Sequence, residues 1–247
     1  GLTTITLGYG SGSDVVGRRG DAGFSEDVDR HAYRLGLTQV LTRNLIIGLS
    51  YEAVADEGYL NNPYRQVRYL DGNAAAGYSF QPEVYPATRA SNAAALRAKY
   101  HLPYRAAVSG EYRFFTDDWG IDAHTIELGY VQPYRSRWLF DVRYRFYTQS
   151  AADFYSDLFP YANAQNFLAR DKELSTFQSH GPHIGVSYTF LDRQGEAPMK
   201  GSINFAGDYY MFSYDDFRDL RDNAMPGAED LYSFDARVFQ LFFSLWF

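Results

Sequence analysis

Apolar and polar residues alternate with a period of two along much of the chain, in segments of roughly 9 to 12 residues. In the clearest segment, one face carries Trp138, Phe140, Val142, Tyr144 and Phe146, and the other carries Asp141, Arg143 and Arg145. Because successive side chains of a strand point to opposite faces, this pattern predicts strands with one apolar and one charged face. Tilted strands of this length can cross a lipid bilayer.

The same pattern predicts about ten strands. They cover residues 2–10, 30–40, 45–54, 92–101, 105–115, 121–131, 137–148, 183–191, 201–212 and 233–247. The connections alternate in length: 11–29, 55–91, 149–182 and 213–232 are long, whereas 41–44, 102–104, 132–136 and 192–200 are short. The segment 116–120 is the exception, a short connection on the long-loop side. Short turns at one end and long loops at the other are typical of outer-membrane barrels.

The last predicted strand ends on an aromatic residue, with Phe239, Leu241, Phe243, Leu245 and Phe247 on one face. Only helices and closed barrels satisfy every backbone group in lipid. We therefore predict an all-β fold, a transmembrane antiparallel β-barrel of the outer-membrane type, as a single domain over residues 1–247. A soluble β-sandwich is the alternative, but its strands are usually shorter.

Composition supports a membrane barrel. Of the 247 residues, 18% are aromatic, which suits girdles at two membrane interfaces. No apolar run approaches the ~20 residues of a transmembrane helix. Cysteine is absent, so disulfides and thiolate metal sites are excluded, and the net charge of −7 argues against a nucleic-acid partner. The chain starts at Gly1, so we expect that a leader was removed or that this is a fragment.

Four long strings carry a family resemblance. They are LGYGSGSDVVGRRGD at 7–21, SYEAVADEGYLNNPYRQVRYLD at 50–71, QPEVYPATRASNAAALRAKYHLPYRAA at 81–107 and AADFYSDLFPYANAQNFLARDKELSTF at 151–177. The chain resembles a family of predicted Gram-negative outer-membrane proteins catalogued as a domain of unknown function. The resemblance implies that this is the carboxy-terminal portion of a larger barrel of about sixteen strands. Its usual genomic neighbours, a periplasmic flavin transferase and small lipoproteins, imply a lipoprotein or periplasmic redox partner.

Charged residues at inward positions are the candidates for a lumen site. They are Arg34, Glu52, Arg97, Lys99, Arg105, Glu111, Arg113, Glu127, Asp141, Arg143, Arg145 and Asp208. Such a wall could guide small ions and solutes or receive a protein inside the barrel. It could also be a network of ion pairs that fills the interior, because buried charges need partners. Arg113, Arg143 and Arg145 are the best candidates for ion selectivity.

Two loops hold weaker candidates. The first, at 11–29, carries Asp14, Asp21, Glu26 and Asp27, whose oxygens could bind Ca²⁺, although no EF-hand spacing occurs. A solvated or ion-paired loop is the alternative. The second, at 55–91, combines Tyr64, Arg65 and Arg68, side chains suited to stacking and to binding anions. Such aromatic-rich loops could instead pack against each other or fold into the lumen as a plug.

No catalytic constellation is apparent among the five histidines. His180 and His183 would point to opposite faces of a strand, and no G-x-S-x-G element occurs. We therefore expect neither an enzyme nor a cofactor. The leading hypothesis is an outer-membrane channel, or a transport or export component, surrounded by outer-membrane lipid. A structural scaffold that holds a lipoprotein or redox partner is the alternative, and an outer-membrane enzyme is third.

Overall fold

The computed structural model describes residues 2–193, 199–221 and 224–247 and is built almost entirely of β-strands. The strands are β1 (Thr3–Arg18), β2 (Asp21–Val40), β3 (Leu45–Gly58), β4 (Gln66–Leu70), β5 (Tyr78–Pro82), β6 (Thr88–His101), β7 (Ala107–Asp117), β8 (Asp122–Tyr134), β9 (Trp138–Gln149), β10 (Phe177–Arg193), β11 (Met199–Arg218) and β12 (Leu231–Trp246). A short 3₁₀ helix, η1, covers Lys172–Leu174. Within the described ranges, no helix is long and apolar enough to cross a membrane.

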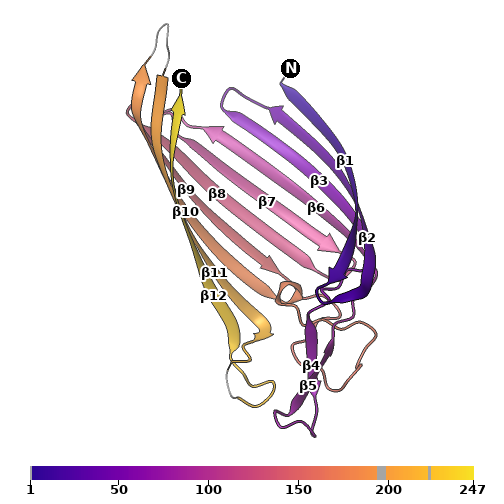
Figure 1. The fold of residues 1–247 in the computed structure, drawn as a ribbon. Helices are drawn as coiled ribbons and strands as arrows, with labels where there is room; N and C mark the ends of the chain where they lie inside the picture. The colour runs from indigo at the N-terminus through magenta and orange to yellow at the C-terminus, as the bar shows by residue number, and fades with distance from the viewer. Residues whose placement is uncertain (1, 194–198, 222–223) are drawn as a thin grey trace.

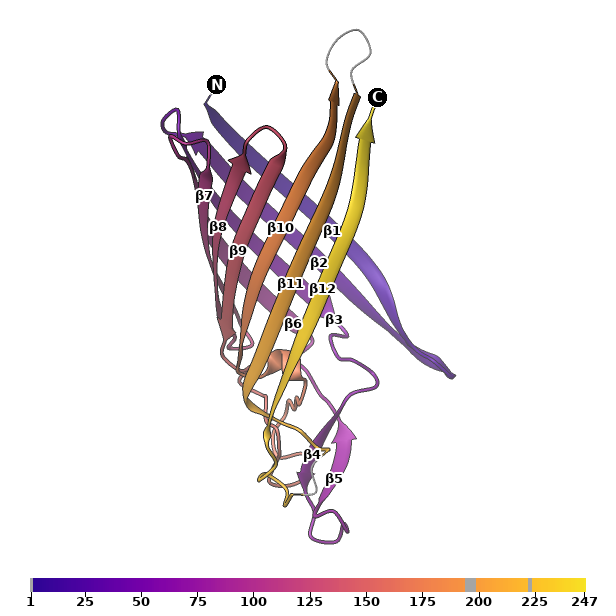
Figure 2. The same ribbon diagram turned by 90° about the vertical axis from the view of Figure 1, so that its left-hand side faces the viewer.

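Ten of these strands form one sheet in the order β1-β2-β3-β6-β7-β8-β9-β10-β11-β12, and every neighbouring pair is antiparallel. The remaining two, β4 and β5, pair as a separate hairpin. The large sheet curls strongly but stays open, with β1 and β12 at its edges (Figures 1 and 2). The all-β fold is thus confirmed: the ten predicted strands form one large antiparallel sheet, which is not closed into a barrel. The larger barrel of about sixteen strands stays a prediction.

The two ends of the sheet differ. At one end, called the turn end, residues 41–44, 102–106 and 135–137 make short connections, and both chain termini lie there (Figure 1). At the other, called the loop end, lie the long connections 59–87, 150–176 and 219–230. The short connection on the loop side is confirmed at 118–121. The turn predicted at 192–200 lies partly outside the described residues.

The long loop predicted at 11–29 is wrong. β1 and β2 continue as a paired hairpin, joined by Arg19 and Gly20, and Gly20 adopts the positive φ of 83° that a tight turn favours. The hydrophobic alternation stops there because polar and small residues dominate both faces of the extension, yet backbone pairing continues. β10 and β11 also extend several residues toward the loop end, beyond their predicted bounds.

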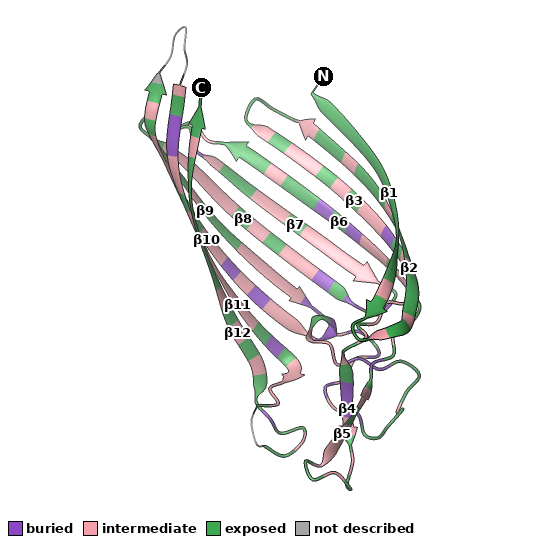
Figure 3. Ribbon diagram, viewed as in Figure 1, coloured by how far each residue is buried: buried purple, intermediate pink, exposed green. Residues whose placement is uncertain are grey.

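The apolar face of the sheet follows the predicted phase. Cross-strand neighbours on it include Leu7 with Leu35, and Leu35 with Tyr51. Large apolar side chains are left open to the surroundings, with Leu7 78% and Phe239 72% exposed. A soluble protein rarely exposes an apolar surface of this extent, whereas lipid covers it at no cost. Figure 3 shows few buried residues along the sheet and several in the loops.

The charged face lies on the inside of the curl. Phe115 belongs to this face and packs against buried residues of the loop cluster, and Gln149 donates to the carbonyl of Ser175 beside η1. In Figure 2, the segment with η1 lies between the front and rear strands of the curled sheet. The loops therefore fold over the interior at the loop end, against the charged face.

This assignment of faces predicts an asymmetric response to charge. We expect Val142→Lys, on the apolar face, to cost about 2–4 kcal/mol of membrane stability, because its ammonium group would face hydrocarbon. The measurement is urea-induced unfolding of the full chain in lipid vesicles, followed by tryptophan fluorescence. Ser187→Lys, on the charged face, is the control and should cost much less. Equal losses at the two positions would contradict the assignment.

Candidate functional site

The charged face brings the predicted lumen residues together as cross-strand pairs. Arg34 on β2 donates to Glu52 on β3 at 3.0 Å, and Arg97 on β6 donates to Glu111 on β7 at 3.1 Å. Arg34 and Arg97 are nevertheless well exposed, so these bonds leave their charges in contact with the interior space. The strand pairs β2–β3 and β6–β7 thus carry fixed cations and anions side by side.

A second cluster lies across β9, β10 and β11. Arg143 donates to Asp141 at 2.9 Å, and His183 lies 2.7 Å from Asp208. The other ring nitrogen of His183 is 3.4 Å from Arg143, which joins the two pairs. Sequence reasoning missed the role of His183, because only the strand register places it opposite Asp208.

Four of the predicted cations have no salt bridge within the described part of the chain: Lys99, Arg105, Arg113 and Arg145. Arg105 was expected at an inward strand position, but it lies in the turn-end connection 102–106, with a positive φ of 69°. The guanidinium of Arg113 lies 5.7 Å from the ring centre of Phe115, and that of Arg145 lies 5.5 Å from that of Tyr147. Both are cation–π contacts, which leave the positive charge uncompensated by a carboxylate. Glu127 is the direct cross-strand neighbour of Glu111 and of Arg145.

Two cavities border this wall. One of about 230 Å³ is lined by Arg34, Glu52, Arg97 and Arg113, together with small residues such as Gly36. Another of about 280 Å³ is lined by Arg97, Lys99, Glu111 and Glu127. Small residues leave space beside the long charged side chains. Hydrated anions could therefore contact several guanidinium groups at once.

The three long loops fold into one cap at the loop end. Backbone bridges join Tyr69 to Phe159 and Val84 to Leu168, so the loop that contains β4 and β5 is knitted to the loop that contains η1. Two apolar clusters form beneath these bridges. The first consists of Trp119, Ile121, Ala152, Phe154, Ala169 and Leu174. The second consists of Val67, Phe159 and Leu168.

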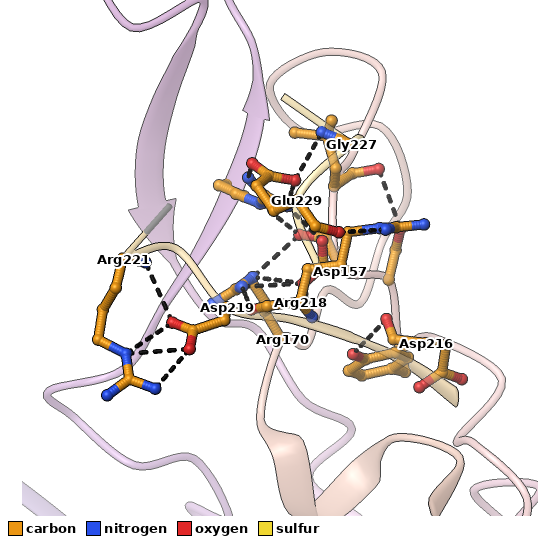
Figure 4. Close-up of polar contacts among 12 residues, drawn as sticks. Asp157, Arg170, Asp216, Arg218, Asp219, Arg221, Gly227 and Glu229 are labelled. Atoms are coloured by element: carbon orange, nitrogen blue, oxygen red, sulfur yellow. Dashed lines mark hydrogen bonds and ion pairs between the residues drawn. The ribbon is translucent and has the colours of Figure 1, made fainter. Parts of the chain in front are cut away.

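A buried ion network holds the cap together (Figure 4). Arg68 of β4 is fully buried and binds Asp157 and Glu229, one from each of the other two loops. Asp157 also accepts from Arg170 at 2.8 Å and from the backbone N–H of Arg218 at 3.1 Å. All three loops therefore meet at one guanidinium group, and loss of any partner would leave a buried charge uncompensated.

Protonation behaviour in the cap follows from these contacts. Hydrogen bonding to Arg68 lowers the pKa of Glu229 to about 2. Burial acts to lower the pKa of Arg68, but its hydrogen bonds to Glu229 and Asp157 outweigh that effect and raise it. Burial instead raises the pKa of Glu83, which lacks such a guanidinium bond.

The predicted ligand residues of the second loop make contacts with other parts of the same chain. The Tyr64 hydroxyl accepts from the backbone N–H of Arg19 at 2.5 Å, and Arg65 forms an ion pair with Asp171. Arg68 is enclosed by the network above. This arrangement corresponds to the packed alternative, in which aromatic and guanidinium side chains join loops to each other.

The predicted Ca²⁺ candidates are spread along a hairpin. Asp14 lies on β1, Asp21, Glu26 and Asp27 lie on β2, and Asp21 is paired with Arg18. Across the described ranges, no group of three or more His, Cys, Asp or Glu side chains could hold a metal ion. The structure does not bring these carboxylates together.

Comparison with known proteins gives one family. Residues 15–220 match the family described as "Protein of unknown function (DUF3570)". The chain belongs to the DUF3570 family. This confirms the resemblance to an uncharacterised family inferred from the loop strings.

A solved structure similar to this DUF3570 protein is that of OmpT, an in-vitro folded outer-membrane protein of Vibrio cholerae in its trimer form. The TM-score is 0.47 and the identity 9%, over 93% of this chain and 64% of that chain. The chain thus spans less than two thirds of that structure's length. Among curated proteins, none matches significantly.

The buried network predicts how the cap responds to a mutation. We expect Glu229→Gln to destabilise the cap by about 3 kcal/mol, because it leaves the charge of Arg68 partly uncompensated. Hydrogen exchange of residues 59–87 and 150–176 would report this loss, with the ten-stranded sheet as an internal reference. Asp219→Asn is the matched control: Asp219 bonds the exposed Arg221, and such a contact contributes less than about 1 kcal/mol.

The difference between wild type and Glu229→Gln should depend on pH. Because the pKa of Glu229 is lowered on folding, its contribution is fully present above its ordinary value of 4.5 and is lost as the pH falls toward about 2. The two proteins should therefore converge in acid. A difference that is the same at pH 6 and pH 2.5 would contradict this account.

Proposed function

We propose that this protein resides in the bacterial outer membrane and acts there as a channel or as a component of transport or export. The observation that carries the proposal is the charged face inside the curl, opposite an apolar face of the kind that lipid covers. A barrel that served only as a membrane anchor would need no charged inner face, because burying charges in an apolar interior costs free energy. The long-loop end would then face outward.

The excess of cations favours anionic cargo. Each of Arg34, Arg97 and Arg143 has a carboxylate partner, whereas Arg113 and Arg145 have aromatic rings instead. A guanidinium group without a carboxylate keeps its attraction for small anions in a narrow aqueous path. The cap at the loop end would control entry, and in this proposal the protein has no catalytic role.

A structural scaffold is the second candidate, favoured by the ordered cap. Its three loops share a buried ion network, so they form one ordered surface and not three independent loops. In this proposal the cap could hold a lipoprotein against the barrel, whereas a periplasmic redox partner would bind at the opposite, turn end. In that case the cap would block the interior permanently.

The deciding experiment is conductance of the full-length protein in a planar bilayer under a salt gradient. We expect open steps with a preference for anions, and a shift toward cations in the double variant Arg113→Gln, Arg145→Gln, because two interior cations without a carboxylate partner are removed. The control is Arg237→Gln, on the apolar face, which should leave ion selectivity unchanged. Folded protein that never conducts would contradict the channel and favour the scaffold.

A further inference from the structure

A repeated tyrosine contact marks one level of the apolar face. In each of the five hairpins closed at the loop end, a tyrosine on the first strand reaches a polar side chain on the second. The pairs are Tyr9 with His31, Tyr51 with Asn92, Tyr112 with His124, Tyr144 with His180 and Tyr209 with Asp235, at 3.0, 2.5, 2.8, 2.6 and 2.6 Å. In all five, the polar residue lies two positions from the direct partner of the tyrosine, toward the loop end.

The strand register places the first four pairs at a common height, and the fifth, Tyr209 with Asp235, lies two residues nearer the loop end. His180 is opposite Phe146, which is opposite Ile126, so across two strands the register drifts two residues from His124. One residue per strand is what a tilt of about 35° produces, given a rise of ~3.4 Å and a strand spacing of ~4.8 Å. On β12, Asp235 lies directly across from His180 through Met211. The same drift of one residue per strand toward the turn end therefore places this level at Arg237. We call this level the tyrosine belt.

Tyrosine and histidine have an apolar body and a polar tip, so a belt of them suits the boundary between hydrocarbon and headgroups. Arg237 is exceptional at this boundary. Among residues 182–188, 203–209 and 237–245 of β10, β11 and β12, it is the one Lys or Arg at an apolar-face position. Its side chain is exposed, and its guanidinium lies 5.3 Å from the ring centre of Tyr209.

A groove on the apolar face runs from Arg237 toward the middle of the sheet. It has a volume of about 560 Å³, and Pro182, Ile184, Phe205 and Phe239 line its sides. Gly207 forms the floor: the nearest atoms to a Cβ there would be ring carbons of Phe239 and Phe205, at 3.5 and 3.6 Å. The absent side chain thus opens a mainly apolar slot, bordered by one cation, Arg237, and by one anion, Asp208.

We propose that this groove binds a lipid with a phosphate headgroup, in the leaflet at the loop end. The acyl chain would lie along Ile184, Phe205 and Phe239, and the phosphate would meet Arg237 at the belt. Arginine is costly within hydrocarbon but nearly neutral near the interface, where its planar group can bind phosphate by two hydrogen bonds. The inference rests on the proposed place in the outer membrane.

The test is native mass spectrometry of the full chain in detergent, with dioleoyl phosphatidic acid as the probe and dioleoylglycerol as the same lipid without phosphate. We expect Arg237→Gln to weaken binding of phosphatidic acid about tenfold and to leave dioleoylglycerol unchanged, because only the charge-assisted contact is lost. Arg43→Gln, in a connection at the turn end, is the control for net charge and should bind as wild type does.

A second pair of variants tests the groove. Gly207→Leu should weaken binding of both lipids, since it fills the floor. Gly110→Leu, another apolar-face glycine with only an ordinary contact to Leu128, should change neither. Equal binding by wild type and Arg237→Gln, or equal effects at the two glycines, would overturn the inference. Protein that conducts in bilayers and yet gives either result would retain the proposed function and lose only the lipid site.

Discussion

The pairing of backbone amides and carbonyls along ten antiparallel strands is the constraint on which the structure depends. In lipid, each unpaired group would cost several kcal/mol, so the ladder must be continuous from β1 to β12. Continuous pairing fixes the register, and the register fixes which side chains share a face. Leu7, Leu35 and Tyr51 meet on the apolar face for the same reason that Arg34 meets Glu52 on the charged face.

The protein uses arginine–carboxylate pairs in two settings with different consequences. On the charged face, Arg34 and Arg97 remain exposed, so their pairs cost little and leave a field in the interior. In the cap, Arg68 is fully buried with Asp157 and Glu229, so the same chemistry becomes a structural requirement. The wall can therefore be changed by mutation with little loss of stability, whereas the centre of the cap cannot.

Period-two alternation predicts the ten strands and their faces because a strand in lipid must keep one face apolar. Alternation cannot predict the hairpin extension near Asp14 and Asp27, where both faces meet water and the pattern disappears. Nor can it predict that Arg68 would be buried, since its partners Asp157 and Glu229 lie far away in the sequence and only loop folding brings them together. Alternation predicts most positions of the charged face, but Arg105 lies in a connection instead of on β7, and the pairing of His183 with Asp208 required the register.

The most direct test of the two-faced sheet uses the absence of native cysteine. Single cysteines placed along β9 from Leu139 to Arg145, in protein reconstituted into vesicles, would be labelled with a charged, water-soluble thiol reagent. The account predicts strict alternation: rapid labelling at 141, 143 and 145, and protection by lipid at 140, 142 and 144. Uniform labelling along the strand would contradict it.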